Sequence, residues 1–170
     1  VLFLDGVILD VTDKKKSEAN LKRTEQMYTA IFNSTNDAIF IHASDGRVID
    51  VNERMCRIFE CTREEARRYS VKDISSGDPG YTQAEALTRI NDAIEKGPQT
   101  FEWLTKRRKS GEKFWSEVLL CPFSVSSETM VMAVVRDISE RKQAENAMRE
   151  REARYRTLFE SSRDAVFVME

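Results

Sequence analysis

The sequence predicts an α+β fold with an antiparallel sheet. The first observation is the order of segments: two short strand-like runs, then several helical segments, then three strand-like runs separated by turns. This order is typical of an α+β domain. The second observation is a stretch of sequence that recurs at an interval of 127 residues, which is too long for a solenoid repeat and predicts a whole domain with its connecting helix as the unit. A chain of 170 residues, 41% of them hydrophobic, can bury the core of one such unit.

The repeat defines the organisation of the chain. Residues 10–42 align without a gap on residues 137–169, and the aromatic pairs Tyr28/Tyr155 and Phe32/Phe159 are identical. One complete unit is therefore expected between fragments of two others, as in a piece of a tandem array. The expected parts are the end of a preceding unit at 1–12, a connecting helix at 13–32, the complete core at 33–138, an exit helix at 139–161 and the start of a following unit at 162–170.

Both connecting segments are predicted to be long helices. Neither contains Gly or Pro, and Thr12 and Ser139 are good N-cap residues. Leu21, Tyr28 and Ile31 belong to an a/d seam along the first helix, interrupted by a polar residue. The seam predicts a marginal parallel coiled coil in a homodimer, and a helix that packs only on its own domain is the alternative.

Local patterns predict the elements of the central unit in turn. The apolar run 38–42 ends at a Ser-Asp-Gly turn, and 47–51 is its hairpin partner. Asn52 caps one helix, and a capping box that begins at Thr62 opens another. The remaining expected elements are a polar loop at 75–80, a helix at 83–96, and strands at about 100–108, 113–124 and 130–137.

Composition disfavours nucleic-acid and membrane partners and excludes some kinds of site. Twenty-seven basic and twenty-nine acidic residues leave a net charge of -2, which provides no field to attract nucleic acid or an anionic membrane. No apolar run approaches the roughly 18 residues of a membrane span. Cys56, Cys61 and Cys121 lack a CxxC spacing, and this indicates reduced structural thiols in a cytoplasmic protein. A single His excludes a multi-histidine metal site, and the absence of a phosphate-binding glycine loop or a nucleophile elbow predicts no catalytic residues.

Four motifs together resemble a PAS domain. They are Asp37-Ala38-Ile39-Phe40 with Asp45-Gly46, Val51-Asn52, Arg107-Arg108-Lys109-Ser110-Gly111 before Phe114-Trp115, and Val135-Arg136-Asp137-Ile138-Ser139-Glu140-Arg141-Lys142. The last motif resembles the Asp-Ile-Thr-type junction between a PAS core and its signalling helix in bacterial sensor proteins. The resemblance implies a five-stranded antiparallel sheet with helices on one face, a small cavity, and signalling helices at both ends.

The same resemblance implies a sensory or signal-relay module of a tandem-PAS bacterial signalling protein, such as a sensor histidine kinase or a diguanylate cyclase. Its partners would be a second copy of the chain, the neighbouring PAS and output domains, and a small organic ligand. The alternative is a ligand-free dimerisation or scaffold module. Any kinase or cyclase domain of the parent protein would lie outside this sequence.

The cofactor of such a module stays open on the sequence. The stretch that corresponds to the flavin-binding helix of PAS photoreceptors is roughly 69–73, and it contains no Cys. Residues 83–96, where haem-binding members carry the iron ligand, contain no His. Haem and covalently reacting flavin are therefore not expected, whereas a non-covalent flavin or a small organic metabolite stays open.

The cavity is expected between the sheet and the helices. Its candidate lining residues are Phe40, His42, Met55, Phe59, Leu87, Ile90, Val118 and Val135. Polar groups are scarce in this set, which favours an apolar or aromatic small molecule, or an empty collapsed pocket, over a charged ligand. If a ligand is present, His42 is the expected polar handle because it can both donate and accept. The alternative is a His at the strand end that is half exposed or satisfied by the backbone. Trp103 is expected either to stack on a ligand or to pack in the core.

The signal junction is expected at Asp137, Ile138 and Ser139, where the last strand meets the exit helix. Ile138 is predicted to pack on the core while Ser139 caps the helix. A shift of the strand would then rotate or fray the first turn of the helix.

Overall fold

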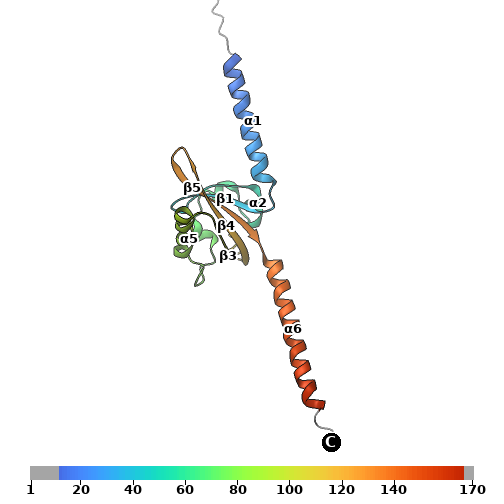
Figure 1. Cartoon of the computed structure of the whole chain (residues 1–170). Helices are drawn as coiled ribbons and strands as arrows, with labels where there is room; N and C mark the ends of the chain where they lie inside the picture. Colours follow the sequence, from blue (N-terminus) through green and yellow to red (C-terminus); the bar gives the residue numbers. More distant parts are fainter. Residues whose placement is uncertain (1–11, 167–170) are drawn as a thin grey trace, which may run out of the picture. The chain divides into compact units, whose positions relative to one another are not determined.

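The computed structural model describes residues 12–166 (Figure 1). Two parts are described separately, the helix α1 (Thr12–Ser34) and residues 36–166. Of the predicted end of a preceding unit at residues 1–12, residues 1–11 lie outside the described residues, and Thr12 belongs to α1.

The core is an antiparallel five-stranded sheet in the order β2-β1-β5-β4-β3. The strands are β1 (Ala38–Ala43), β2 (Val48–Val51), β3 (Gln99–Lys106), β4 (Lys113–Val125) and β5 (Glu128–Asp137). The α+β prediction is confirmed. The first and last strands pair in the centre, with Phe40 opposite Ala133, so residues nearly 100 positions apart close the core.

Four helices follow β2 along the chain and pack on the sheet. They are α2 (Glu53–Ile58), α3 (Arg63–Ala66), α4 (Val71–Ile74) and α5 (Gln83–Lys96). The Asn52 side chain accepts the Met55 N–H, and Thr62 forms the expected capping box with Glu65. The helix α4 was not predicted, because four residues are too few to show a helical period. The signal that marks it is the Ser70/Asp73 capping box.

Alternate residues of the central strands face these helices and are buried. Phe40 and Val118 are 0% and 7% exposed, and they belong to one hydrophobic cluster with Met55 and Phe59 of the α2 segment and Ile90 of α5. The period-2 pattern of strands explains this alternation. It leaves one face of the sheet available to line a cavity.

The β4–β5 hairpin turns through Ser126 and Ser127, whose φ angles are 49° and 70°. Both lie in the left-handed region that two-residue hairpin turns require. Serine is not favoured there, so the turn has only a weak sequence signal. The structure extends β4 and β5 beyond their predicted ends, up to the turn.

The helix α6 (Ser139–Val166) is longer than the predicted 139–161. It continues through residues 164–166, where the sequence analysis expected the first strand of a following unit. A helix propagates through local hydrogen bonds, whereas a strand needs a partner strand, and no described strand pairs with this segment. Residues 167–170 lie outside the described part of the chain.

Candidate ligand pocket and signal junction

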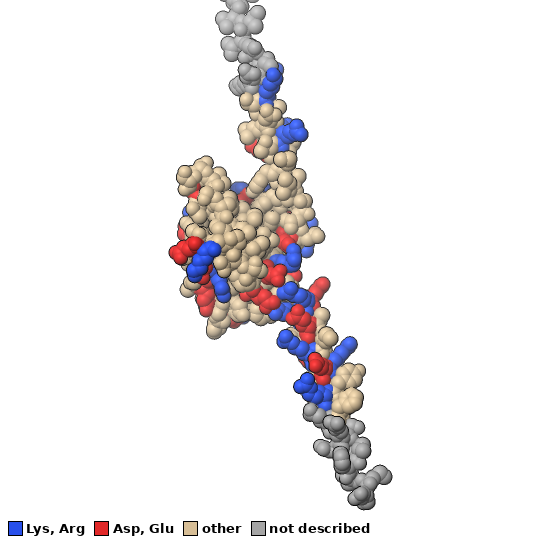
Figure 2. Space-filling model, viewed as in Figure 1, with Lys and Arg blue, Asp and Glu red and all other residues tan. Residues whose placement is uncertain are grey.

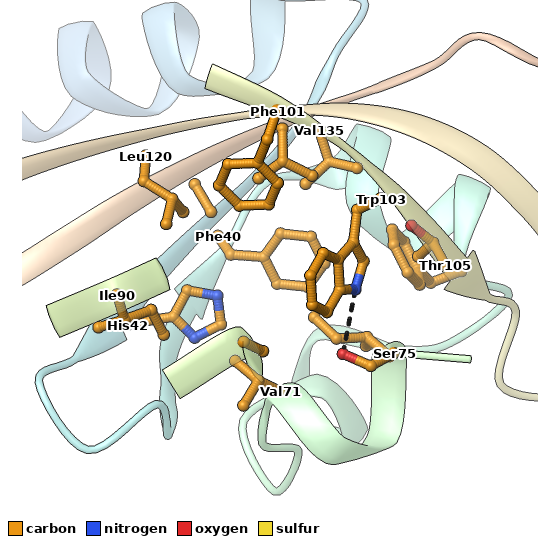
Figure 3. A pocket seen from close by; sticks show the side chains of 15 residues that line it. Phe40, His42, Val71, Ser75, Ile90, Phe101, Trp103, Thr105, Leu120 and Val135 are labelled. Carbon is orange, nitrogen blue, oxygen red and sulfur yellow. Dashed lines mark hydrogen bonds between the residues drawn. The ribbon is translucent and has the colours of Figure 1, made fainter. Parts of the chain in front are cut away.

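A cavity of about 60 Å³ lies between the inner face of the sheet and the helices (Figure 3). It is lined by Phe40, His42, Phe59, Val71, Ile74, Ser75, Ala86, Ile90, Phe101, Trp103, Thr105, Val118, Leu120, Ala133 and Val135. None of these side chains carries a full charge at neutral pH. The cavity therefore offers nothing to compensate a charged ligand for its loss of water.

Six of the eight residues that the sequence singled out line this cavity: Phe40, His42, Phe59, Ile90, Val118 and Val135. The other two, Met55 and Leu87, do not. Met55 is completely buried in the core, where Cys61 Sγ lies 3.8 Å from its sulfur. On α5, Ala86 and Ile90 are four residues apart and share the face toward the cavity. Leu87 is rotated away from that face and packs over the backbone of Gly46.

Strand β3 supplies a wall of the cavity that the sequence analysis did not assign. Phe101, Trp103 and Thr105 alternate along it and all line the cavity. Their period-2 spacing shows that they share a face, but it does not show which face is inside. The Trp103 indole Nε1–H donates to Ser75 Oγ at 3.2 Å, as Figure 3 shows.

A second hydrogen-bond pair closes the same end of the cavity. Thr105 Oγ1 lies 2.5 Å from Ser116 Oγ, and the Ser116 hydroxyl donates to the backbone oxygen of Trp103 at 3.1 Å. Because Ser116 uses its proton on that oxygen, Thr105 is the donor of the hydroxyl pair. These buried polar groups are thus satisfied by one another.

His42 is the polar group at the other end of the cavity. It is 2% exposed, so it is not half exposed, and its ring has the backbone partner that the alternative allowed. Its ring stacks on Phe40, with centroids 5.5 Å apart, and its Nδ1 lies 3.3 Å from the carbonyl oxygen of Gly46. Burial lowers the pKa of His42 from 6.5 to about 4, against the opposing effect of the Gly46 and Arg47 carbonyls. The imidazole is therefore neutral at physiological pH.

Thiols and metal ligands do not form a second centre in the described part of the chain. Burial raises the pKa of Cys61 to about 11, and that of Cys56 in the same direction. Both thiols are therefore protonated and weakly nucleophilic at neutral pH. Among the described residues, no three His, Cys, Asp or Glu side chains are placed to hold a metal ion.

The junction between β5 and α6 is tied to the core by its backbone. Ile138 is 4% exposed, and its N–H donates to the Trp115 carbonyl oxygen at 2.9 Å. Asp137 accepts the Ser139 N–H at 2.9 Å and forms an ion pair with Arg107 at 3.1 Å.

The expected cap by the Ser139 hydroxyl is not formed. Its Oγ is buried without a hydrogen-bond partner in the described structure. The Ile138 carbonyl accepts the first helical hydrogen bond, from the Lys142 N–H. Ser139 is therefore already inside the helix, and the preceding Asp137 carboxylate takes the acceptor role.

Ion pairs join the start of α6 to the sheet. Lys142 Nζ lies 2.5 Å from Glu102 Oε2, and Arg141 lies 3.3 Å from Glu102 and 3.5 Å from Glu117. The hydrogen bond from Lys142 holds the pKa of the Glu102 carboxyl below its usual value. Figure 2 shows acidic and basic side chains interspersed where α6 leaves the core.

A comparison with known protein families identifies the family of this domain. The family model described as "PAS domain" matches residues 36–140, which is more than half of the chain. The chain belongs to the PAS domain family. The matched PAS segment contains the cavity and ends one residue after Ser139.

Relatives of this PAS chain include two sporulation kinases of Bacillus subtilis (strain 168). Sporulation kinase E is 25% identical over 175 residues, which cover 95% of this chain and 21% of the kinase. Sporulation kinase A is 23% identical over 146 residues, which cover 84% of this chain and 23% of the kinase. The PAS chain thus spans under a quarter of the length of these relatives.

A solved PAS domain has the same architecture. It belongs to an HTR-like protein from Haloarcula marismortui, is 25% identical, and superimposes with a TM-score of 0.65 over 73% of this chain and 99% of the other. In the described residues of our structure, no helix is both long enough and apolar enough to cross a membrane.

Proposed function

We propose that this PAS domain is the sensory and signal-relay module of a multidomain signalling protein, that it binds a small neutral ligand, and that it passes the signal to an output domain through α6. The observation that carries the proposal is the cavity, which is apolar except for a buried neutral imidazole and a group of bonded hydroxyls. Its volume of about 60 Å³ is well below the roughly 300–1,000 Å³ of sites for drug-sized ligands. A flavin or a haem would need a rearranged core.

Strand β3 is the proposed link between the cavity and the exit helix. Trp103 faces the cavity, whereas its neighbour Glu102 projects from the opposite face and binds Lys142. Because β3 is an edge strand, its outer side is held only by a short bridge from Ser75 and Ser76 to Thr105 and Leu104, and it can shift more easily than the central strands. A ligand that moves Trp103 would then also move Glu102, which holds the first turn of α6 through Lys142.

The β5–α6 junction is the second route of the relay. Ile138 is buried, and Asp137 holds the first turn of α6 through the Ser139 N–H. Loss of such a cap is worth about 1 kcal/mol, which is similar to many allosteric coupling energies. A small change in strand position is therefore enough to alter the start of the helix.

Ligand extraction from the natively purified chain, followed by mass spectrometry, tests the sensory proposal. We expect a neutral organic molecule, or no retained molecule together with saturable binding of small neutral probes. A tightly held phosphate-bearing cofactor would contradict this proposal.

Hydrogen exchange of α6 with and without a bound probe tests the relay. We expect a probe to change exchange in the first turn of α6, and Glu102→Gln to reduce the change because it removes the charge that binds Lys142. Glu128→Gln is the matched control, since Glu128 is an exposed residue at the far end of β5 from α6. Equal responses of the two variants would contradict a relay through β3.

We also propose that the chain forms a homodimer through α1. Leu21, Tyr28 and Ile31 are 61%, 50% and 65% exposed in the single chain, and they follow the spacing of a coiled-coil seam. In α6 the corresponding positions are Met148, Tyr155 and Leu158, which are also exposed. A dimerisation module without a ligand is the second candidate function, and these two apolar stripes favour it.

Sedimentation of charged variants tests the dimer. Leu21→Asp with Ile31→Asp should give monomers, because two carboxylates would enter the seam. Gln26→Asp with Thr29→Asp adds the same charge at exposed positions away from the seam and should leave the dimer intact. A dimer that survives the first pair of substitutions would place the interface elsewhere.

The setting of the module is proposed as cytoplasmic. Three free cysteines, with Cys56 and Cys61 both protonated at neutral pH, suit a reducing compartment. The near-neutral net charge gives no reason to expect nucleic acid as a partner. The expected partners are a second copy of the chain and the neighbouring PAS and output domains of the parent protein.

A further inference from the structure

The hydrogen bond of His42 determines which ring nitrogen carries the proton. A backbone carbonyl can only accept, so Nδ1, 3.3 Å from the Gly46 oxygen, must be the donor. Because burial keeps the ring neutral, Nε2 has no proton and presents a lone pair. The expectation that His42 offers a ligand both a donor and an acceptor is therefore too broad.

No described residue donates a hydrogen bond to Nε2. In Figure 3 the imidazole lies beside Phe40 and Ile90, which have no polar side-chain atoms. The other lining side chains that carry donors lie at the β3 end of the cavity. Trp103 donates to Ser75, and Thr105 donates within the hydroxyl pair. His42 lines the cavity, so a molecule there can reach Nε2, and an acceptor that exchanges water for an occupant without a donor pays a cost.

The volume limits what can supply that donor. An engineered apolar cavity of about 150 Å³ accepts benzene, and this cavity of about 60 Å³ is less than half as large. Scaled by volume from the six atoms of benzene, the occupant that fits without a rearrangement has about two or three non-hydrogen atoms, and a four-atom molecule needs a slight expansion of the cavity.

We infer that the pocket selects small neutral molecules with a hydroxyl or N–H group, and that His42 is the specificity-determining residue because its Nε2 accepts the hydrogen bond from that group. This inference rests on the proposed sensory function and names the ligand class of the same cavity. A ligand of equal size with only acceptor atoms leaves Nε2 unpaired, and the penalty corresponds to an affinity about tenfold lower or more.

The test compares 2-propanol with acetone, which have the same number of non-hydrogen atoms and differ in the presence of a donor. Binding is measured by NMR titration of the whole chain. Because the chain has a single His, the ring nitrogen signals in a ¹⁵N spectrum belong to His42 without further assignment. We expect both probes to bind, 2-propanol about tenfold more tightly, and only 2-propanol to shift the Nε2 signal.

Two variants separate the acceptor from the shape of the side chain. His42→Leu removes the acceptor at similar volume and should abolish the preference, whereas His42→Gln retains an acceptor oxygen and should restore part of it. If neither variant folds, the Nε2 signal of the unmodified chain still tests the inference, because only 2-propanol should shift it.

Equal affinities for the two probes, an unchanged Nε2 signal, or an intact preference in His42→Leu would overturn the inference while the sensory proposal stands. Failure of both probes to bind would overturn the proposed ligand-binding function and this inference with it.

Discussion

The buried imidazole of His42 makes the stability of the domain depend on pH. In the unfolded chain the His has its ordinary pKa of 6.5, whereas burial lowers the pKa in the folded chain to about 4. Between these values the unfolded state binds a proton that the folded state does not. The free energy of unfolding therefore falls as pH falls through this window and is fully recovered above it.

The size of the effect follows from the two pKa values. The difference between 6.5 and about 4 corresponds to a loss of about 3 kcal/mol once both states are protonated. Between about pH 7.5 and about pH 5, the expected loss is about 2 kcal/mol. This is a large part of the roughly 5–15 kcal/mol that stabilises a typical domain.

Denaturant unfolding at the two pH values measures this loss. Exposed carboxylates with lowered pKa values, such as Glu65 and Glu85, stabilise the fold above their ordinary value of 4.5 and lose that contribution only at lower pH. The chosen range therefore isolates His42. In His42→Leu the free energy of unfolding should be nearly the same at both pH values. A wild-type protein that is equally stable at both would refute the reasoning, because a neutral buried imidazole cannot avoid this dependence.

Three further predictions concern the turns and the junction. Replacing Ser126 by Asn and Ser127 by Gly should stabilise the chain by about 1 kcal/mol, because Asn-Gly readily adopts their positive φ angles; an unchanged denaturation midpoint would contradict this. Gly46→Ala should destabilise it by at least about 1 kcal/mol, since φ is 83° and the new Cβ would lie 2.8 Å from Leu87 Cδ2; wild-type thermal stability would show that the loop adapts. Asp137→Ala should cost about 1 kcal/mol and speed hydrogen exchange in the first turn of α6, whereas Asp137→Asn keeps an acceptor oxygen and should change less.

Features that depend on neighbouring residues were predictable from the sequence. The Thr62 capping box has both partners within three residues, and the structure contains it. The helix at 83–96 was predicted with its bounds, because its apolar period is a local signal. The short helix α4 was not predicted from the sequence because its only local signal is one capping box.

Positions that depend on distant neighbours were predicted less well. Met55 and Leu87 carry the apolar character of pocket residues, yet the first is covered by the core and the second by the Gly46 loop. Ser139 has the side chain of an N-cap, but the backbone geometry of the junction gives that role to Asp137. In each case the residue type suited several environments, and contacts from other elements selected one.

The sequence by itself determined the order of the elements, the antiparallel class of the sheet and the apolar character of the inner face, because hydrophobic period and capping are properties of a short segment. Only the tertiary structure decided that β3 forms a wall of the cavity and that His42 is buried at the other end of the cavity, with Nδ1 on the Gly46 carbonyl. The physical reason is that burial and the direction of a hydrogen bond depend on groups brought together by the pairing of β1 with β5 and the packing of α5. The protonation state of His42, and with it the proposed choice of ligand, arises from that assembly.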